Sequence, residues 1–94
     1  MIDYNEEMKA FAAKMVTELW PVFKNDRESL EDWCEALTLW LDGKHTKWTQ
    51  LMNDKQKSVA VAQVVSGVVE ITGDPRMGLA ALYTALYAML EACC

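Results

Sequence analysis

The sequence has few residues that interrupt regular structure and no run that could place it in a membrane. Only two prolines and four glycines occur among its 94 residues. The longest apolar run, Leu79–Leu90, is broken by Thr84 and is shorter than the roughly 20 residues that a spanning helix needs. The acidic start of the chain lacks the basic and then apolar pattern of a signal peptide. We therefore expect a cytoplasmic protein without a membrane segment.

Cysteine and histidine are also scarce, which argues against metal and redox chemistry. The three cysteines, Cys34, Cys93 and Cys94, are odd in number and have no CxxC spacing, and adjacent cysteines bond each other only with strain. A metal site would have to combine them with His45, the only histidine, although no ligand spacing links these positions. The sequence predicts reduced thiols, no metal and no other cofactor.

Basic residues are few as well. Nine Lys and Arg stand against 14 Asp and Glu, which gives a formal net charge of −5. Binding to nucleic acid or to an anionic membrane generally requires a basic surface, so we expect neither partner. The apolar content of 52%, with four tryptophans, is well above that of disordered chains. Because two independent cores would be too small at this length, we expect one helical domain over residues 1–94.

Apolar residues recur every three or four positions through most of the chain, which is the period of an amphipathic helix. A first helix is predicted to start at Asp3 and to end or bend sharply near Trp20, because Pro21 lacks a backbone N–H. A second helix is predicted to use Ser29 as its N-cap. Gly43 follows this helix as a residue that can adopt a positive φ.

Residues 54–72 are ambiguous, because valine and isoleucine are frequent there and favour strands. The polar residues Gln56, Gln63 and Glu70 recur every seven positions, however, and this is a helical period. We therefore predict a third helix in this segment.

The next helix is predicted to begin at Asp74, an N-cap residue, followed by Pro75, whose missing N–H costs nothing in the first helical turn. Residues 73–78 also have the glycine spacing of a phosphate-binding loop. Leu79 and Ala80 stand where that loop needs Lys and then Ser or Thr. This segment is therefore interpreted as a helix start and not as a nucleotide site.

Together these signals predict an all-α fold, a small helical bundle of four principal helices. A short extra helical turn is expected at Trp48, Leu51 and Met52. The last helix, from Met77 to Ala92, is apolar on nearly every side and has to be covered on every side. Either the other helices enclose it, or it completes its burial against another molecule such as a second copy.

An acidic face on the second helix is the candidate partner-binding site. Its residues are Glu28, Glu31, Asp32, Glu35 and Asp42. Glu28 with Asp32 and Glu31 with Glu35 are like-charge pairs four residues apart, which repel mildly. A basic partner would relieve this repulsion, whereas the alternative is an ordinary solvated face. A catalytic carboxylate pair is not expected, because exposed carboxylates lack a cleft and a raised pKa.

A secondary basic patch follows the acidic face. It comprises Lys44, His45, Lys47, Lys55 and Lys57. Three interpretations stay open: a solvated loop, a contact with an acidic protein surface such as the acidic helix of another copy, and, most weakly, nucleic acid. His45 has no nucleophile or orienting carboxylate beside it in the sequence, so it is not predicted to be catalytic.

No nucleophile–base pair, metal-ligand set or phosphate loop can be recognised, so the sequence predicts a protein that is not an enzyme. The leading hypothesis is a protein–protein interaction module that binds through the acidic face as an adaptor, regulator or inhibitor of a larger machine. Small acidic helical chains of this kind are often encoded by phages or mobile elements. Two alternatives are a structural subunit that forms a homodimer or larger homo-oligomer through the apolar last helix, and an acidic DNA-mimic decoy.

The cysteines provide a first test. Under native reducing conditions, thiol titration of the subsequently unfolded protein should find all three cysteines as free thiols, because no disulfide framework is expected. Metal analysis of the same preparation should find no zinc, and one zinc ion per chain would contradict the prediction.

Overall fold

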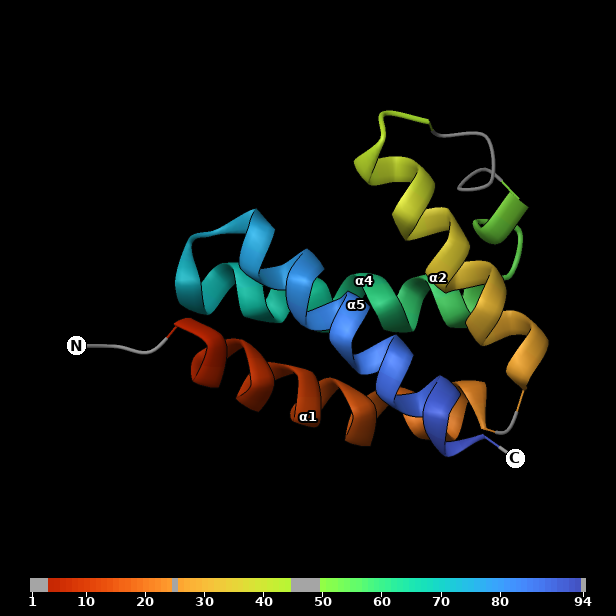
Figure 1. The fold of residues 1–94 in the computed structure, drawn as a ribbon, viewed down its shortest axis with the longest axis horizontal. Helices are drawn as coiled ribbons and strands as arrows, with labels where there is room; N and C mark the ends of the chain where they lie inside the picture. Colours follow the sequence, from red (N-terminus) through yellow and green to blue (C-terminus); the bar gives the residue numbers. More distant parts are fainter. Residues whose placement is uncertain (1–3, 25, 45–49, 94) are drawn as a thin grey trace.

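The computed structural model describes residues 4–24, 26–44 and 50–93. Within these residues the chain forms four long helices and no strand (Figure 1). The helices are α1 (Tyr4–Phe23), α2 (Arg27–Leu41), α4 (Lys55–Thr72) and α5 (Pro75–Ala92). The predicted all-α bundle is therefore confirmed, and so is a helix in the valine-rich segment.

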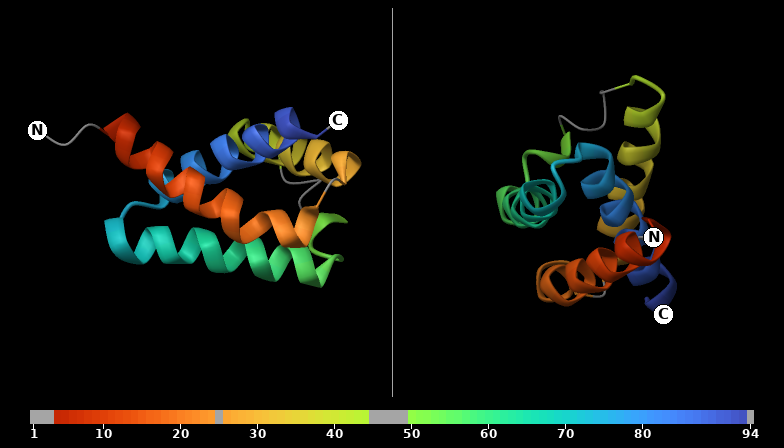
Figure 2. Two further views of the ribbon diagram at one scale, coloured as in Figure 1. Left: turned by 90° about the horizontal axis from the view of Figure 1, so that it is seen from below. Right: turned by 90° about the vertical axis from the view of Figure 1, so that its left-hand side faces the viewer.

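The helix α5 lies at the centre of the bundle, because α1, α2 and α4 all pack against it. The helices α1 and α4 lie side by side and run in opposite directions (Figures 1 and 2). The helix α2 packs mainly against α5, and its C-terminal end extends beyond the other helices (Figures 1 and 2). One side of α5 is therefore flanked by α2 alone.

The boundaries of α4 and α5 follow the local sequence signals. Asp54 caps α4 and Asp74 caps α5, each by accepting a hydrogen bond from a backbone N–H of the first turn. Gly73 ends α4 in the left-handed conformation, with a φ of 68°. Pro75 occupies the first turn of α5, as predicted.

The helix α1 does not end near Trp20, which was one of the two predicted outcomes. It continues through Pro21 to Phe23, and Lys24 then adopts a positive φ of 54° while its N–H bonds to the Trp20 carbonyl oxygen at 2.6 Å. The proline removes one helical hydrogen bond. The extra turn nevertheless brings Phe23 into the core at 1% exposure, where its ring packs edge-on against Trp33 with 6.0 Å between the ring centres. Burial of this side chain offsets the lost bond.

The N-cap of α2 also differs from the prediction. Asp26, and not Ser29, caps the helix, and its carboxylate accepts from the backbone N–H of Ser29 at 3.1 Å and from its hydroxyl at 2.9 Å. At the other end, Gly43 adopts a φ of 80°, and the Lys44 N–H bonds to the Leu39 carbonyl oxygen at 2.9 Å. This closing pattern confirms the expected role of the glycine.

The predicted extra helical turn is described only in part, because Trp48 lies outside the described residues. Leu51 is helical and packs half-buried against the core, whereas Met52 is 41% exposed. The N–H of Asp54 bonds to the Leu51 carbonyl oxygen at 3.2 Å, so the chain turns directly into α4.

Three sides of α5 are enclosed by the other helices. Its buried residues are Met77, Gly78, Ala81, Leu82, Ala85, Leu86 and Met89. Gly78 permits a close approach of α4, since a Cβ atom there would lie 3.0 Å from the side chain of Val69 and 3.3 Å from the carbonyl oxygen of Val65. The fourth side, which includes Tyr87 at 41% exposure, stays open. None of the helices in the described part of the chain has both the length and the apolarity to cross a membrane.

The central position of α5 predicts a large effect of cavity formation there. Leu86 is 0% exposed, so Leu86→Ala should lower the free energy of unfolding by about 2–5 kcal/mol in urea titrations. Ile71→Ala is the matched control, because Ile71 is 68% exposed and its truncation should change stability by less than about 0.5 kcal/mol. Equal effects of the two substitutions would contradict this arrangement of the core.

Candidate protein-binding surface

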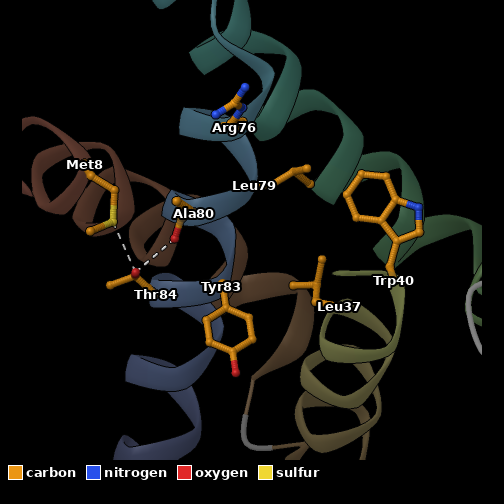
Figure 3. Close-up of a pocket in the computed structure, with 8 residues that line it drawn as sticks. All are labelled: Met8, Leu37, Trp40, Arg76, Leu79, Ala80, Tyr83 and Thr84. Carbon is orange, nitrogen blue, oxygen red and sulfur yellow. Dashed lines mark hydrogen bonds between the residues drawn. The ribbon is translucent and has the colours of Figure 1, made fainter. Parts of the chain in front are cut away.

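An apolar groove lies between α1, α2 and the N-terminal half of α5 (Figure 3). We call it the α2/α5 groove. Its volume is about 390 Å³, and it is lined by Met8, Leu37, Trp40, Arg76, Leu79, Ala80, Tyr83 and Thr84. The side chain of Leu79 points across the groove toward the indole of Trp40. Arg76, at one end, is the only charged residue of the lining.

The shape of the groove follows from the way α2 leaves the bundle. Leu37 is buried at 2% exposure, whereas Trp40, one turn later, is only half-buried. On α5, the lining includes Ala80, whose small side chain occupies little of the space between the helices. Because larger side chains surround this alanine, a space remains that no side chain of the described residues fills.

The polar groups of the groove are largely used within the protein. The Thr84 hydroxyl donates to the Ala80 carbonyl oxygen at 2.9 Å and lies 3.2 Å from the Met8 sulfur (Figure 3). The Tyr83 hydroxyl lies 3.4 Å from the Thr38 hydroxyl and donates to the Tyr87 hydroxyl at 3.2 Å. The lining therefore offers apolar surface and shape more than hydrogen-bonding groups, which suits binding better than catalysis.

The open side of α5 continues beyond the groove toward the end of the helix. We call this surface the α5 strip, formed by Arg76, Ala80, Tyr83, Thr84, Tyr87, Ala88 and Glu91. Its C-terminal part is a shallow depression that includes Ala88 and Glu91. The rings of Tyr83 and Tyr87 pack together with 4.7 Å between their centres, so the most exposed aromatic residue of the strip is held by its neighbour.

The predicted acidic face lies on the outer side of α2, away from the groove. Glu28, Glu31, Glu35 and Asp42 are exposed and Asp32 is half-buried. The expected repulsion is reduced at Glu31, because the Arg27 Nε atom lies 2.9 Å from its carboxylate oxygen. Both side chains are more than half exposed, and pairs of this kind contribute little stability.

Of the predicted basic patch, the structure describes Lys44, Lys55 and Lys57. Lys44 and Lys55 are exposed, while His45 and Lys47 lie outside the described residues. Lys57 differs from these two exposed lysines, because its ammonium group pairs with carboxylates of the protein. It lies 3.0 Å from the Asp54 carboxylate, and its side chain is only 16% exposed.

Lys57 instead joins the ends of three helices. Its Nζ atom is also 3.6 Å from the carboxylate of Asp26, the N-cap of α2, and 5.8 Å from the ring centre of Phe23 at the end of α1. We call Lys57, Asp26, Asp54 and Phe23 the Lys57 clamp. The aliphatic part of the Lys57 side chain is largely buried, and its ammonium group lies near the carboxylates of Asp26 and Asp54. Lys57 therefore stabilises the packing of these helix ends.

The described cysteines are buried thiols. Cys34 and Cys93 are both free and about 5% exposed. Burial, with a smaller contribution from Glu31, raises the pKa of the Cys34 thiol to about 11, so little nucleophilic thiolate forms at neutral pH. Among the described residues no three His, Cys, Asp or Glu side chains are grouped so that they could hold a metal ion. His45 and Cys94 lie outside these residues.

Comparison of the chain with protein-family models, with curated proteins and with solved structures gave no match. The surface is therefore interpreted from its own geometry. The sequence did not predict the groove, because apolar periodicity shows which residues of a helix face a neighbour but not where two helices diverge. The one sequence signal for an exposed apolar surface was the excess of apolar residues on the last helix.

The Lys57 clamp predicts a dependence of stability on pH. Hydrogen bonds from Ser29 hold the pKa of Asp26 below its usual value, and hydrogen bonds from Lys57 do the same for Asp54. A carboxyl group with a lowered folded pKa stabilises the fold above its unfolded pKa of about 3.9, and this contribution is lost as the pH falls through the folded pKa. The free energy of unfolding should therefore decrease below about pH 4.

The matched variant is Asp26→Asn with Asp54→Asn, which keeps both cap acceptors but removes the two titrating groups. Urea unfolding at neutral and acidic pH should show a smaller loss in this variant than in the wild type. An identical loss in both proteins would show that other carboxylates cause the acid dependence.

Proposed function

We propose that this chain is a non-enzymatic protein–protein interaction module whose α2/α5 groove receives apolar side chains of a protein partner. The groove itself carries the proposal. It is an open cavity of about 390 Å³ with aromatic and aliphatic walls and one charged residue at its end. Partly exposed apolar surfaces of this kind mark interaction sites, and binding energy concentrates where a partner side chain fills such a pocket.

The length of the surface favours a protein over a small molecule. The groove opens into the α5 strip, so the exposed surface follows α5 from Arg76 to Glu91. At a rise of 1.5 Å per residue this distance is roughly 22 Å, which is about four helical turns. A partner helix can place apolar residues along such a surface at three- and four-residue intervals.

The acidic face of α2 supports a second contribution to binding. Its exposed carboxylates and the net charge of −5 would attract a basic partner over a long range and raise its association rate. Adaptor, regulator and inhibitor are the roles open to such a module, in the cytoplasm where its thiols stay reduced. The DNA-mimic alternative is weakened, because Arg27 neutralises one of the few carboxylates of the face.

Two substitutions in the groove test this function. Leu79→Glu places a charge beside Trp40, and Ala80→Phe fills the floor with a larger side chain. Both variants should stay helical by circular dichroism and should lose at least tenfold in partner affinity, which corresponds to about 1.4 kcal/mol. Val59→Glu is the matched control, because Val59 is 55% exposed on α4 and lies outside the groove lining.

The measurement is affinity capture from a host lysate with mass-spectrometric identification, followed by titration of the purified partner. The proposed function requires partners that bind the wild type and the control but not the two groove variants. Glu31→Lys with Glu35→Lys changes the net charge from −5 to −1 and should slow association at low salt only. Equal binding by all folded variants would refute the groove as the binding site.

A further inference from the structure

The two charges of the α5 strip lie at opposite ends of the helix. Arg76 stands in the first turn of α5 and Glu91 in the last turn, which contains no basic residue. The C-terminus of a helix carries a partial negative charge, so Glu91 lies beside a charge of its own sign, whereas the partial positive charge beside Arg76 is offset by the carboxylate of Asp74, the N-cap of α5. Within residues 4–24, 26–44 and 50–93 neither side chain forms an ion pair or a hydrogen bond.

The α5 strip is complementary to the α5 strip of a second copy that runs in the opposite direction. The midpoint of the strip lies between Tyr83 and Thr84. Each residue before this midpoint therefore lies level with the residue of the second copy that is the same number of positions after it. Arg76 then lies level with Glu91 of the second copy, and Ala80 lies level with Tyr87. Opposite charges meet at both ends, and in the middle a large side chain meets a small one.

We propose that the α5 strip is the interface of a homodimer, in which two α5 helices pack antiparallel about a twofold axis between residues 83 and 84. This inference rests on the proposed function and names a second copy of the chain as the occupant of the groove. Tyr87 of each copy lies over Ala80 in the groove of the other. The twofold symmetry makes every contact occur twice.

Three features of the strip favour a second copy over an unrelated chain. Antiparallel packing sets the N-terminus of each α5 beside the C-terminus of the other, so the adverse interaction of Glu91 with its own helix end is relieved by Arg76 of the second copy. Tyr87 is 41% exposed, and burying it supplies an aromatic anchor. The tilted packing of its ring against Tyr83 holds the ring before binding, which lowers the entropy lost on association.

Charge exchange tests the pairing, with the full chain studied under reducing conditions so that no intermolecular disulfide forms. Light scattering and sedimentation over a wide concentration range should show the wild type as a dimer. Arg76→Glu alone and Glu91→Arg alone each place like charges together at both ends of the interface. Each should raise the dimer dissociation constant by roughly tenfold.

The double variant Arg76→Glu with Glu91→Arg restores opposite charges and should return the dissociation constant to within about threefold of the wild type. Lys55→Glu and Glu70→Arg are matched controls, because they make the same charge changes at exposed positions of α4. Both should leave the dissociation constant unchanged. Recovery only in the double variant would support the antiparallel pairing.

Three results would overturn the homodimer: a wild type that stays monomeric at every concentration, a dimer that is insensitive to the single substitutions, or a double variant that is not restored. The proposed function is judged separately by partner capture. A monomeric wild type that still binds a different protein through the groove would refute the homodimer and leave the interaction function intact.

Discussion

Burial of α5 against three other helices is the interaction on which the rest of the structure depends. Leu82, Leu86 and Met89 are 0% exposed, and α1, α2 and α4 each pack against this helix. A helix that is apolar on nearly every side gains most when it is surrounded. The chain has only three further long helices among its described residues, and α2 diverges from α5 along its length. One side of the central helix therefore remains open.

The Lys57 clamp attaches the start of α2 to the bundle. It connects the end of α1 and the N-caps of α2 and α4 through Phe23, Asp26 and Asp54. The N-terminal end of α2 is thus attached to the bundle, whereas its C-terminal end extends beyond the other helices (Figure 1). The groove lies where Leu37 and Trp40 of α2 face α5.

The chemistry of the open side favours recognition. Its hydroxyl groups bond to one another or to the backbone, and the Cys34 thiol is buried with a raised pKa. Its two charges, Arg76 and Glu91, stand at opposite ends of α5. Such a surface favours the binding of a partner that has apolar side chains and charges opposite to those of Arg76 and Glu91. In the proposed homodimer, an antiparallel second copy of α5 supplies both.

The sequence by itself determined the features that depend on neighbouring residues. Gly43 and the Asp74-Pro75 pair were predicted correctly, because caps and helix starts satisfy backbone groups within a few residues. The helix end at Phe23 and the role of Lys57 were decided only by the tertiary structure, through burial and charges from distant segments. The groove, too, was decided only by the tertiary structure. The sequence predicted that the last helix needed cover, but only the direction of α2 decided which side was left uncovered.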